Sequence, residues 1–435
     1  MSRRVVITGI GLVSPLGNSP ERLWSALAAG QSGVRELKSI PVEAFPTRFG
    51  AEALEFTGAI EDFGPLEKAK ARNVKKNLKA MCREMQFGIA VAQLALADAK
   101  FPLDSADLDR VGCVYGSDYM LTVPQEFTSG MRKSLDGQET FDFRNWADKG
   151  LPEVEPLWLL KYLPNLPASH ISIFNDLRGP NNSLTMREAS SNLAIGEAYC
   201  TILRGHADAM LAGATGARVH PARTIHVVTQ EEIAVEGDDP AKLSRPFDKG
   251  RRGSVMGEGA AAIMLEELAY AQARGAKILG EVIGFGSSAV SDRRGVADYK
   301  AAFTNVLKQS LASARLGPDD VGHINAHGLS SRRCDADEAQ AIAAVFAGRK
   351  QPLSVVAAKS YFGNLGAASG LVELIGSLLA QQHGRLFRTL NYETPDPECP
   401  VHVIAADGSA PGDSFIKLSI TPQGQASGVA IRRFS

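Results

Sequence analysis

The chain has 435 residues, of which 44% are hydrophobic and 22% are charged, and its formal net charge is −1. This length and composition allow a large buried core, enough for two domains or one duplicated domain. The near-zero net charge argues against a general nucleic-acid binder, and no apolar run approaches the ~18 residues that a membrane span needs. We therefore expect no nucleic-acid partner and no membrane span.

The N-terminal residues predict a strand and then a helix. The run 5–13 is apolar, β-branched and broken by glycine, which is typical of a buried strand and not of a signal peptide. Ser19-Pro20-Glu21 opens a helix to about Ala29, and Gly30 is placed to end it. The glycines between residues 9 and 17 do not form a GxGxxG fingerprint, so dinucleotide binding is disfavoured.

The segment from Lys68 to Arg83 is strongly basic and contains no acidic residue. Such a run is either a solvated helix face or a landing patch for an acidic partner, with an attraction that weakens as salt is added. An amphipathic helix is predicted for residues 87–96. The basic side chains are Lys68, Lys70, Arg72, Lys75, Lys76, Lys79 and Arg83.

The middle of the chain predicts a strand-to-helix elbow. A buried strand at 111–116 is followed by an irregular excursion at about 119–165, which we expect to lie on the surface as a cap or dimer element. Gly179-Pro180 and a short β-prone run then lead into a helix that ends near 203–204. The residue at the top of such an elbow faces open backbone N–H groups and the positive end of the helix dipole. Enzymes place nucleophiles there, but this elbow carries Glu188.

Strand–helix alternation restarts after the connector at 244–253. It predicts an α/β fold with helices on both faces of the sheet, built in two passes along the chain. We divide the chain into an N-terminal half (1–258) and a C-terminal half (259–435). The predicted elements of the second half are strands at 260–265, 278–286, 324, 415–420 and 428–432, helices at 269–274, 299–314, 336–346 and 365–382, and an elbow at 359–363.

Few residues outside the first elbow suggest chemistry on their own. His327 lies on a turn after a predicted strand, where a lone histidine is more often structural. The other seven histidines show no ligand-like spacing, so we expect no metal site. Five widely spaced cysteines without a CxxC pair suggest a reducing compartment, and we expect a cytoplasmic protein. The absence of GxSxG disfavours the usual nucleophile-elbow hydrolase.

Several long segments, in the right order, resemble the β-ketoacyl-acyl-carrier-protein synthases that elongate fatty acids, within the thiolase superfamily. The resemblance implies a five-layered αβαβα fold from two similar halves, working as a dimer. It implies no bound cofactor, since the substrate is carried on the phosphopantetheine arm of an acyl carrier protein. The segments are 5–11, the elbow at 179–180, 244–248, 256–259, 325–328, and 359–360 followed by 363 and 366–368.

When the family's reactive residues are carried over by position, two of the three fall on residues of a different type in this chain. The acyl-accepting Cys falls on Glu188, the first His on His327 and the second His on Asn364, while the supporting Lys falls on Lys359 with Glu373 as its acidic neighbour. The resemblance therefore implies a catalytic set of Glu188, His327, Asn364 and Lys359.

The resemblance also bears on substrate binding and docking. The gating Phe, whose backbone N–H completes an oxyanion hole, aligns with Pro422, which has no N–H. The two pantetheine-binding threonines align with Leu329 and Ser331, so one hydroxyl is kept and one is lost. In the family context, the basic run becomes a candidate docking surface for the acidic carrier protein through Lys68, Arg72, Lys75, Lys76 and Lys79.

The glutamate leaves several functions open. A carboxylate cannot hold an acyl chain as a stable thioester, which makes ordinary 3-oxoacyl synthase activity the least favoured. An ionised Glu188 would repel a malonyl carboxylate by roughly 3–4 kcal/mol at an effective dielectric near 20, so a malonyl decarboxylase requires the protonated form. Glu188 could instead be a general base in another acyl or condensation reaction.

The hypothesis that we favour is a non-condensing partner subunit, like the chain-length-determining subunit of a ketosynthase heterodimer. In it, Glu188 only fills the site. The partner would be a Cys-bearing ketosynthase, although the sequence leaves homodimer and heterodimer open. A purely structural Glu188 is expected to pair with Arg187, Lys359 or His327.

Overall fold

The computed structural model describes residues 3–235, 237 and 239–434. Eleven strands form one continuous mixed sheet, and β2 (Arg35–Glu36) and β3 (Phe49–Gly50) form a separate small ribbon. In the part of the chain that the structure describes, no helix combines the length and the apolar character required to cross a bilayer.

The large sheet consists of two groups of strands with the same arrangement. When strands are numbered in chain order within each group, both groups lie in the order 3-2-4-5-1, with matching parallel and antiparallel pairings. The first group in sheet order is β5 (Asn181–Thr185), β4 (Val111–Ser117), β6 (Ala209–Ala217), β7 (Glu258–Glu267) and β1 (Val5–Val13). The second is β10 (Ser354–Val356), β9 (His323–Asn325), β12 (Ser414–Ile420), β13 (Gln425–Arg432) and β8 (Gly280–Ala289), with β11 (His402–Val403) beside β10.

The two groups meet at β1 and β8, which pair antiparallel over only three residues of each strand, 5–7 and 280–282. Each group is therefore a nearly independent sheet, as two similar halves require. The pairing of β7 with β6 and β1 places it in the first group, whereas the predicted division at 258 and 259 falls at the first residue of β7.

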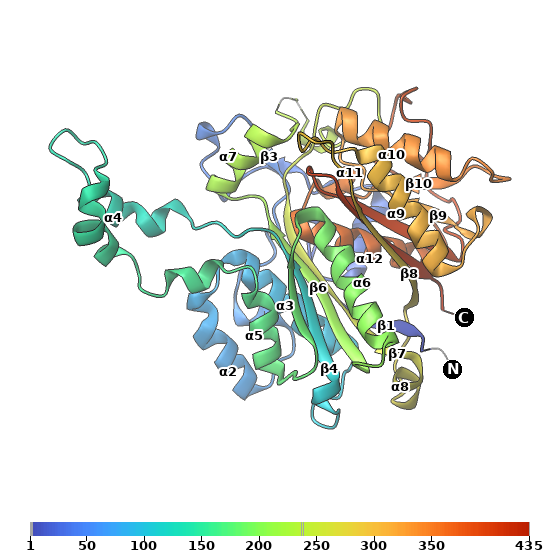
Figure 1. The fold of residues 1–435 in the computed structure, drawn as a ribbon, viewed down its shortest axis with the longest axis horizontal. Coiled ribbons are helices and arrows are strands. Elements are labelled where there is room, and N and C mark those ends of the chain that lie inside the picture. The colour runs from blue at the N-terminus through green and yellow to red at the C-terminus, as the bar shows by residue number, and fades with distance from the viewer. Residues whose placement is uncertain (1–2, 236, 238, 435) are drawn as a thin grey trace.

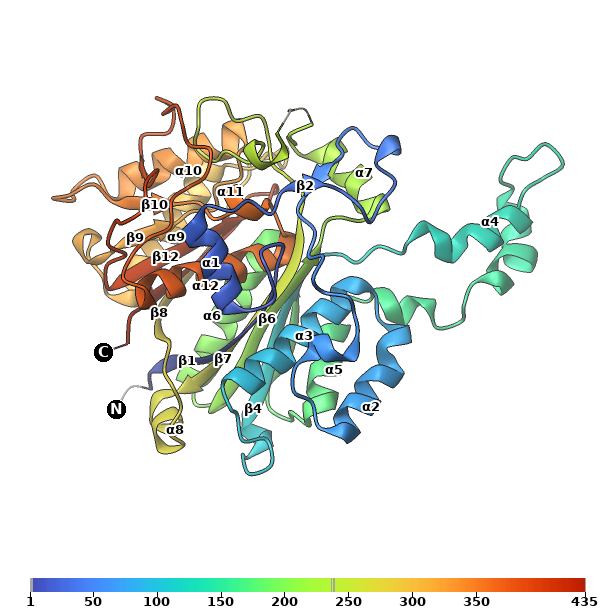
Figure 2. The ribbon, with the colours of Figure 1, turned by 180° about the vertical axis from the view of Figure 1, so that it is seen from behind.

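Helices complete the five layers that the resemblance implies, and the structure confirms this architecture (Figure 1; Figure 2). Three hydrophobic clusters fill the spaces between the layers, because each sheet is apolar on both faces. One outer layer holds α3 (Arg83–Asp98) and α5 (Leu166–Asn175), the central layer holds α6 (Ser190–Leu203) and α12 (Ser369–Gln382), and the other outer layer holds α9 (Tyr299–Ala314) and α10 (Arg332–Val345). The remaining α-helices are α1 (Pro20–Ala29), α2 (Lys68–Asn77), α4 (Thr128–Lys133), α7 (Pro221–Gln230), α8 (Leu268–Ala273) and α11 (Lys359–Phe362).

The predicted excursion is an arm that projects away from the layered body and carries α4 near its far end (Figure 1; Figure 2). We call residues 119–165 the arm. Many of its large apolar side chains are exposed, with Phe143 76% and Leu157 62% exposed. At the nearby sheet edge, β5 pairs with β4 alone, and its residues are exposed or half-buried.

Residues at the helix ends determine where α6 ends and where α10 begins. The helix of the first elbow ends at Leu203, and Gly205 follows with a positive φ of 75°, as predicted. Helix α10 begins at Arg332, earlier than the predicted start at 336, because the Ser331 hydroxyl accepts a hydrogen bond from the Cys334 N–H and caps the first turn.

Candidate active site

Glu188 lies in a short 3-10 turn, Arg187–Ala189, between β5 and α6. Arg187 has a φ of 48°, a left-handed conformation that costs a non-glycine residue roughly 1–2 kcal/mol. This turn buries the Glu188 side chain, which is 1% exposed. The elbow that the sequence predicts is therefore present, and it holds its top residue in the interior.

Three groups surround the Glu188 carboxylate. Its Oε1 accepts hydrogen bonds from Nη1 of Arg218 and from Nδ2 of Asn364, the latter at 3.1 Å. Nε of Arg187 lies 3.6 Å from Oε2. Burial alone would raise the pKa of Glu188, but the charges of Arg187 and Arg218 outweigh it and lower the pKa to about 2. Glu188 is therefore ionised at neutral pH.

A second carboxylate completes a closed ionic cluster. Oε1 of Glu231, just after α7, accepts from Nη2 of Arg187 and, at 2.6 Å, from Nη2 of Arg218. The cluster thus holds two arginines and two glutamates and has no net charge. Of the pairings predicted for a structural Glu188, only the one with Arg187 is found.

Arg218 and Glu231 are residues of the candidate site that the sequence reasoning missed. Arg218 is 1% exposed and follows the last residue of β6. The missed signal was its position at the carboxyl end of a buried parallel strand, since such strand ends share one edge of the sheet with the elbow.

His327 lies just after β9 and is fixed through its backbone. The N–H groups of His327 and Gly328 donate to Glu338 at 2.6 and 2.9 Å. Burial lowers the pKa of His327 well below its usual value, and the positive charges of Lys359, Lys417 and Arg218 act in the same direction. The imidazole is therefore neutral at neutral pH.

Lys359 contacts both His327 and Glu373. Its Nζ donates to the His327 carbonyl at 2.8 Å, lies 3.4 Å from Nδ1, and pairs with Glu373 at 2.7 Å. A cation beside Nδ1 favours a lone pair there, which assigns the ring proton to Nε2. Lys417, from β12, forms a second ion pair with Glu373 that the sequence reasoning also missed. Burial is the main cause that lowers the pKa of Lys417, to about 8.

Asn364 is oriented by its own loop. Its Oδ1 accepts from the Gly366 N–H at 3.0 Å and from the Ser369 hydroxyl at 3.1 Å, so its Nδ2 is the end that reaches Glu188. An amide in this orientation donates to a carboxylate and holds it in place.

Glu188 and His327 line one small cavity of about 100 Å³. Leu329, Ser331 and Pro422 line it too, so the structure brings the predicted substrate-binding residues to the predicted catalytic ones. Asn364 and Lys359 contact Glu188 and His327 without lining the cavity. The remaining lining residues are Gln230, Glu231, Glu232, Tyr299, Cys334, Ile420 and Thr421.

Two lining residues are already engaged. The Pro422 carbonyl accepts from the Tyr299 hydroxyl at 2.9 Å, and the Ser331 hydroxyl accepts from the backbone of α10. No group of three or more histidine, cysteine or acidic side chains suitable for a metal occurs among the residues that the structure describes.

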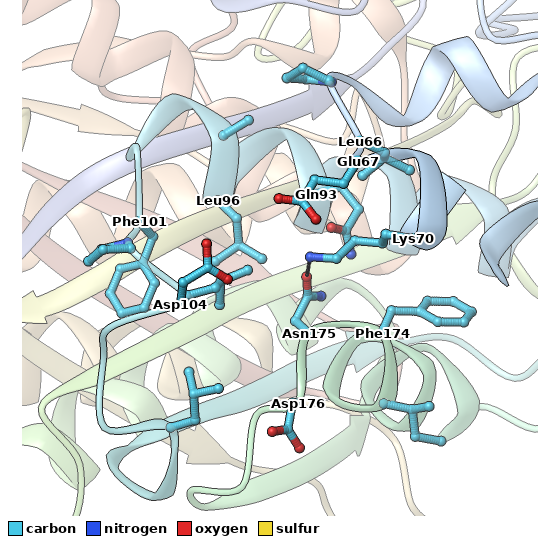
Figure 3. Close-up of a pocket in the computed structure, with 16 residues that line it drawn as sticks. Leu66, Glu67, Lys70, Gln93, Leu96, Phe101, Asp104, Phe174, Asn175 and Asp176 are labelled. Carbon is cyan, nitrogen blue, oxygen red and sulfur yellow. Dashed lines mark hydrogen bonds between the residues drawn. The ribbon is translucent and has the colours of Figure 1, made fainter. Parts of the chain in front are cut away.

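The basic run divides into exposed and engaged side chains. Lys70 points into a pocket and donates to Oδ1 of Asn175 at 3.0 Å (Figure 3), and Arg83 pairs with Glu258 at 2.8 Å. The basic side chains left exposed on and just after α2 are the five predicted for docking, Lys68, Arg72, Lys75, Lys76 and Lys79.

Comparison with known proteins gives consistent matches along nearly the whole chain. Residues 2–271 match the family "Beta-ketoacyl synthase, N-terminal domain", and residues 279–393 match "Beta-ketoacyl synthase, C-terminal domain". A Coxiella burnetii protein named "3-oxoacyl-[acyl-carrier-protein] synthase 2" is 34% identical, covering 92% of this chain and 91% of its own.

Solved structures agree with these matches. A β-ketoacyl synthase from Burkholderia phymatum is 28% identical with a TM-score of 0.84, and the match covers 100% of both chains. The structure titled "The ishigamide ketosynthase/chain length factor" is 25% identical with a TM-score of 0.83, again over 100% of both chains. With both halves matched in order, this chain belongs to the β-ketoacyl synthase family.

Proposed function

We propose that this chain is a non-condensing partner subunit of a ketosynthase, acting in fatty acid or polyketide biosynthesis with chains carried by an acyl carrier protein. The observation that carries the proposal is the state of Glu188, which is buried, ionised and bound by Arg218 and Asn364. A carboxylate held in this way fills the place where the family has its acyl-accepting thiol.

The one thiol that lines the cavity does not replace the missing nucleophile. Burial raises the pKa of Cys334 well above its usual value, and the nearby carboxylates of Asp335 and Glu338 raise it further. Because the thiolate is the nucleophilic form, Cys334 is unreactive at neutral pH. Ordinary condensation therefore has no support in the site.

Glu188 is also a poor general base. Brønsted behaviour favours a base whose pKa is near the working pH, whereas the pKa of Glu188 is about 2. A carboxylate whose pKa is lowered in this way holds a proton taken from a thiol or an activated carbon too weakly at neutral pH. The base-catalysed alternative loses support for this reason.

Decarboxylation fits badly as well. The cavity of about 100 Å³ is well below the ~300–1,000 Å³ of ordinary small-molecule sites. Arg187 and Arg218 are already paired with Glu188 and Glu231. No lysine or arginine is among the described residues that line the cavity, so a malonyl carboxylate would find no counter-charge there. Pro422 has no backbone N–H with which to stabilise an oxyanion.

Features of the surface support pairing with a second chain. The edge strand β5 offers unpaired backbone groups, and the neighbouring arm exposes large apolar side chains. The ishigamide relative is named as a ketosynthase with a chain length factor, and the Coxiella relative is named for the acyl carrier protein. We therefore infer a Cys-bearing ketosynthase as one partner and an acidic carrier protein, docked on the exposed face of α2, as the other.

Mass spectrometry on reconstituted components tests the proposal. This chain is incubated with acyl- and malonyl-loaded carrier protein, alone and with a co-expressed Cys-bearing ketosynthase. We expect this chain to stay unmodified in both cases, to release no CO₂ alone, and to co-purify with the ketosynthase, with extended product only from the pair. An acyl adduct on this chain, or product from it alone, would refute the proposal.

A further inference from the structure

A second pocket lies between α2, α3 and α5, and it shares no lining residue with the Glu188 cavity (Figure 3). Its volume is about 500 Å³, within the ~300–1,000 Å³ range of small-molecule sites. Neither the family resemblance nor the proposed function uses it. Its side chains therefore need a separate explanation.

Two hydrogen-bond donors of this pocket have unused capacity. Gln93 is 4% exposed, and its Nε2 has no hydrogen-bond partner among the residues that the structure describes. An unpaired buried amide destabilises the fold, and a bound acceptor would satisfy its hydrogen-bonding capacity. Nζ of Lys70 has three protons, and Oδ1 of Asn175 is its one hydrogen-bond acceptor within the described ranges. Both donors therefore suit an oxygen acceptor of a ligand.

The walls and the rim of this pocket determine which apolar and charged groups the ligand must carry besides its oxygen acceptor. Part of the wall is apolar, and this part includes Leu66, Leu96, Leu108 and Phe101. The rim carries three exposed carboxylates, those of Glu67, Asp104 and Asp176. Arg178 lies 3.7 Å from Asp176, so the three carboxylates face two positive charges, those of Arg178 and Lys70. The rim keeps an excess of negative charge, which repels a simple anion and attracts a protonated amine.

We propose that this pocket binds a small zwitterion with an apolar body, of the apolar α-amino acid class. Its carboxylate would accept from Gln93 and Lys70, its ammonium would face Asp104 and Asp176, and its side chain would lie along the apolar walls. This site is independent of the proposed function, because it shares no residue with the Glu188 cavity.

Calorimetric titration of the full chain tests the ligand class. L-leucine is compared with 4-methylpentanoate, which lacks the amine, and with 3-methylbutylamine, which lacks the carboxylate. We expect L-leucine to bind at least ten-fold more tightly than either analogue. Absence of leucine binding, or an analogue that binds as tightly as leucine, would overturn the assignment.

Two variants test the individual contacts. Gln93→Leu removes the unpaired amide without adding bulk, so we expect an unchanged or higher Tm and at least ten-fold weaker leucine binding. Asp176→Asn keeps a side chain that tolerates the left-handed conformation (φ 52°), and it should weaken leucine but not 4-methylpentanoate. Gln351→Leu, at an exposed glutamine outside this pocket, is the matched control and should bind leucine normally. Unchanged leucine binding in Gln93→Leu would refute the proposed pose.

Discussion

Nη1 of Arg218 donates to Oε1 of Glu188 in a site where each side chain is 1% exposed. Arg218 also bonds Glu231, so one arginine from the end of β6 joins the elbow to the end of α7. A buried ion pair of this kind is costly to break from one side, because the remaining charge has no compensation.

Removing the charge of Glu188 should destabilise the fold. We expect Glu188→Gln to lower the free energy of unfolding by about 3–5 kcal/mol, since Arg218 loses a buried counter-charge. The double variant Glu188→Gln with Arg218→Met should lose less than the sum of the single changes, with a coupling of about 0.5–3 kcal/mol. Urea denaturation measures all three. Glu398→Gln, at an exposed acid that does not line the cavity, is the control. Additive losses in the double variant would show that the pair is not coupled.

The same pair should appear in the pH dependence of stability. The pKa of Glu188 is about 2 in the folded chain, below the ~4.3 of an ordinary glutamate in an unfolded chain. Its contribution is therefore complete above about pH 5 and is lost as the pH falls toward 2. We expect stability of the wild-type chain to fall more steeply than that of Glu188→Gln between pH 5 and 2. Parallel curves from urea denaturation would mean that Glu188 is not held ionised.

Restoring a thiol alone should not restore an efficient synthase. In Glu188→Cys, position 422 is still proline and offers no backbone N–H to an oxyanion. Adding Pro422→Ala returns that N–H, and we expect acylation by loaded carrier protein to become ~10²–10³ faster than in the single variant. Time-resolved mass spectrometry follows the adduct. Equal rates in the two variants would remove Pro422 from the explanation.

The exposed face of α2 should control carrier-protein binding. Reversing both charges in Lys75→Glu with Lys76→Glu should weaken binding about 5- to 30-fold at low salt, and by less at high salt, because exposed charges are screened. Surface plasmon resonance at two salt concentrations measures this. Lys308→Glu, on α9 in the opposite outer layer, is the matched control. If the α2 variant bound the carrier as tightly as the control, the docking surface would lie elsewhere.

The arm should determine pairing with the ketosynthase. Phe143 and Leu157 expose 76% and 62% of their surface, and charged replacements there would have to be buried on association. We expect Phe143→Asp with Leu157→Asp to abolish co-purification while leaving the Tm nearly unchanged. Val296→Asp changes another exposed apolar residue, outside the arm, and should still co-purify. A complex that survives the arm changes would contradict this assignment.

The sequence by itself determined the order of the elements and the family. The 299–314 pattern predicted helix α9, Gly205 marked the end of α6, and the motifs in order implied two similar halves, because these signals are local to the chain. It also singled out Glu188, His327, Asn364 and Lys359. The fold brings Asn364 into contact with Glu188 and Lys359 into contact with His327, and Glu188 and His327 line one cavity.

Only the tertiary structure decided what Glu188 does there. Arg218 and Glu231 lie 30 and 43 positions after Glu188 in the chain, and Lys417 on β12 reaches Glu373 on α12. Charge, burial and hydrogen bonding set a pKa together, and each depends on which side chains the packed layers place within a few ångströms. A glutamate in the sequence could have been an acid, a base or a filler, and the two arginines around it make it a fixed carboxylate.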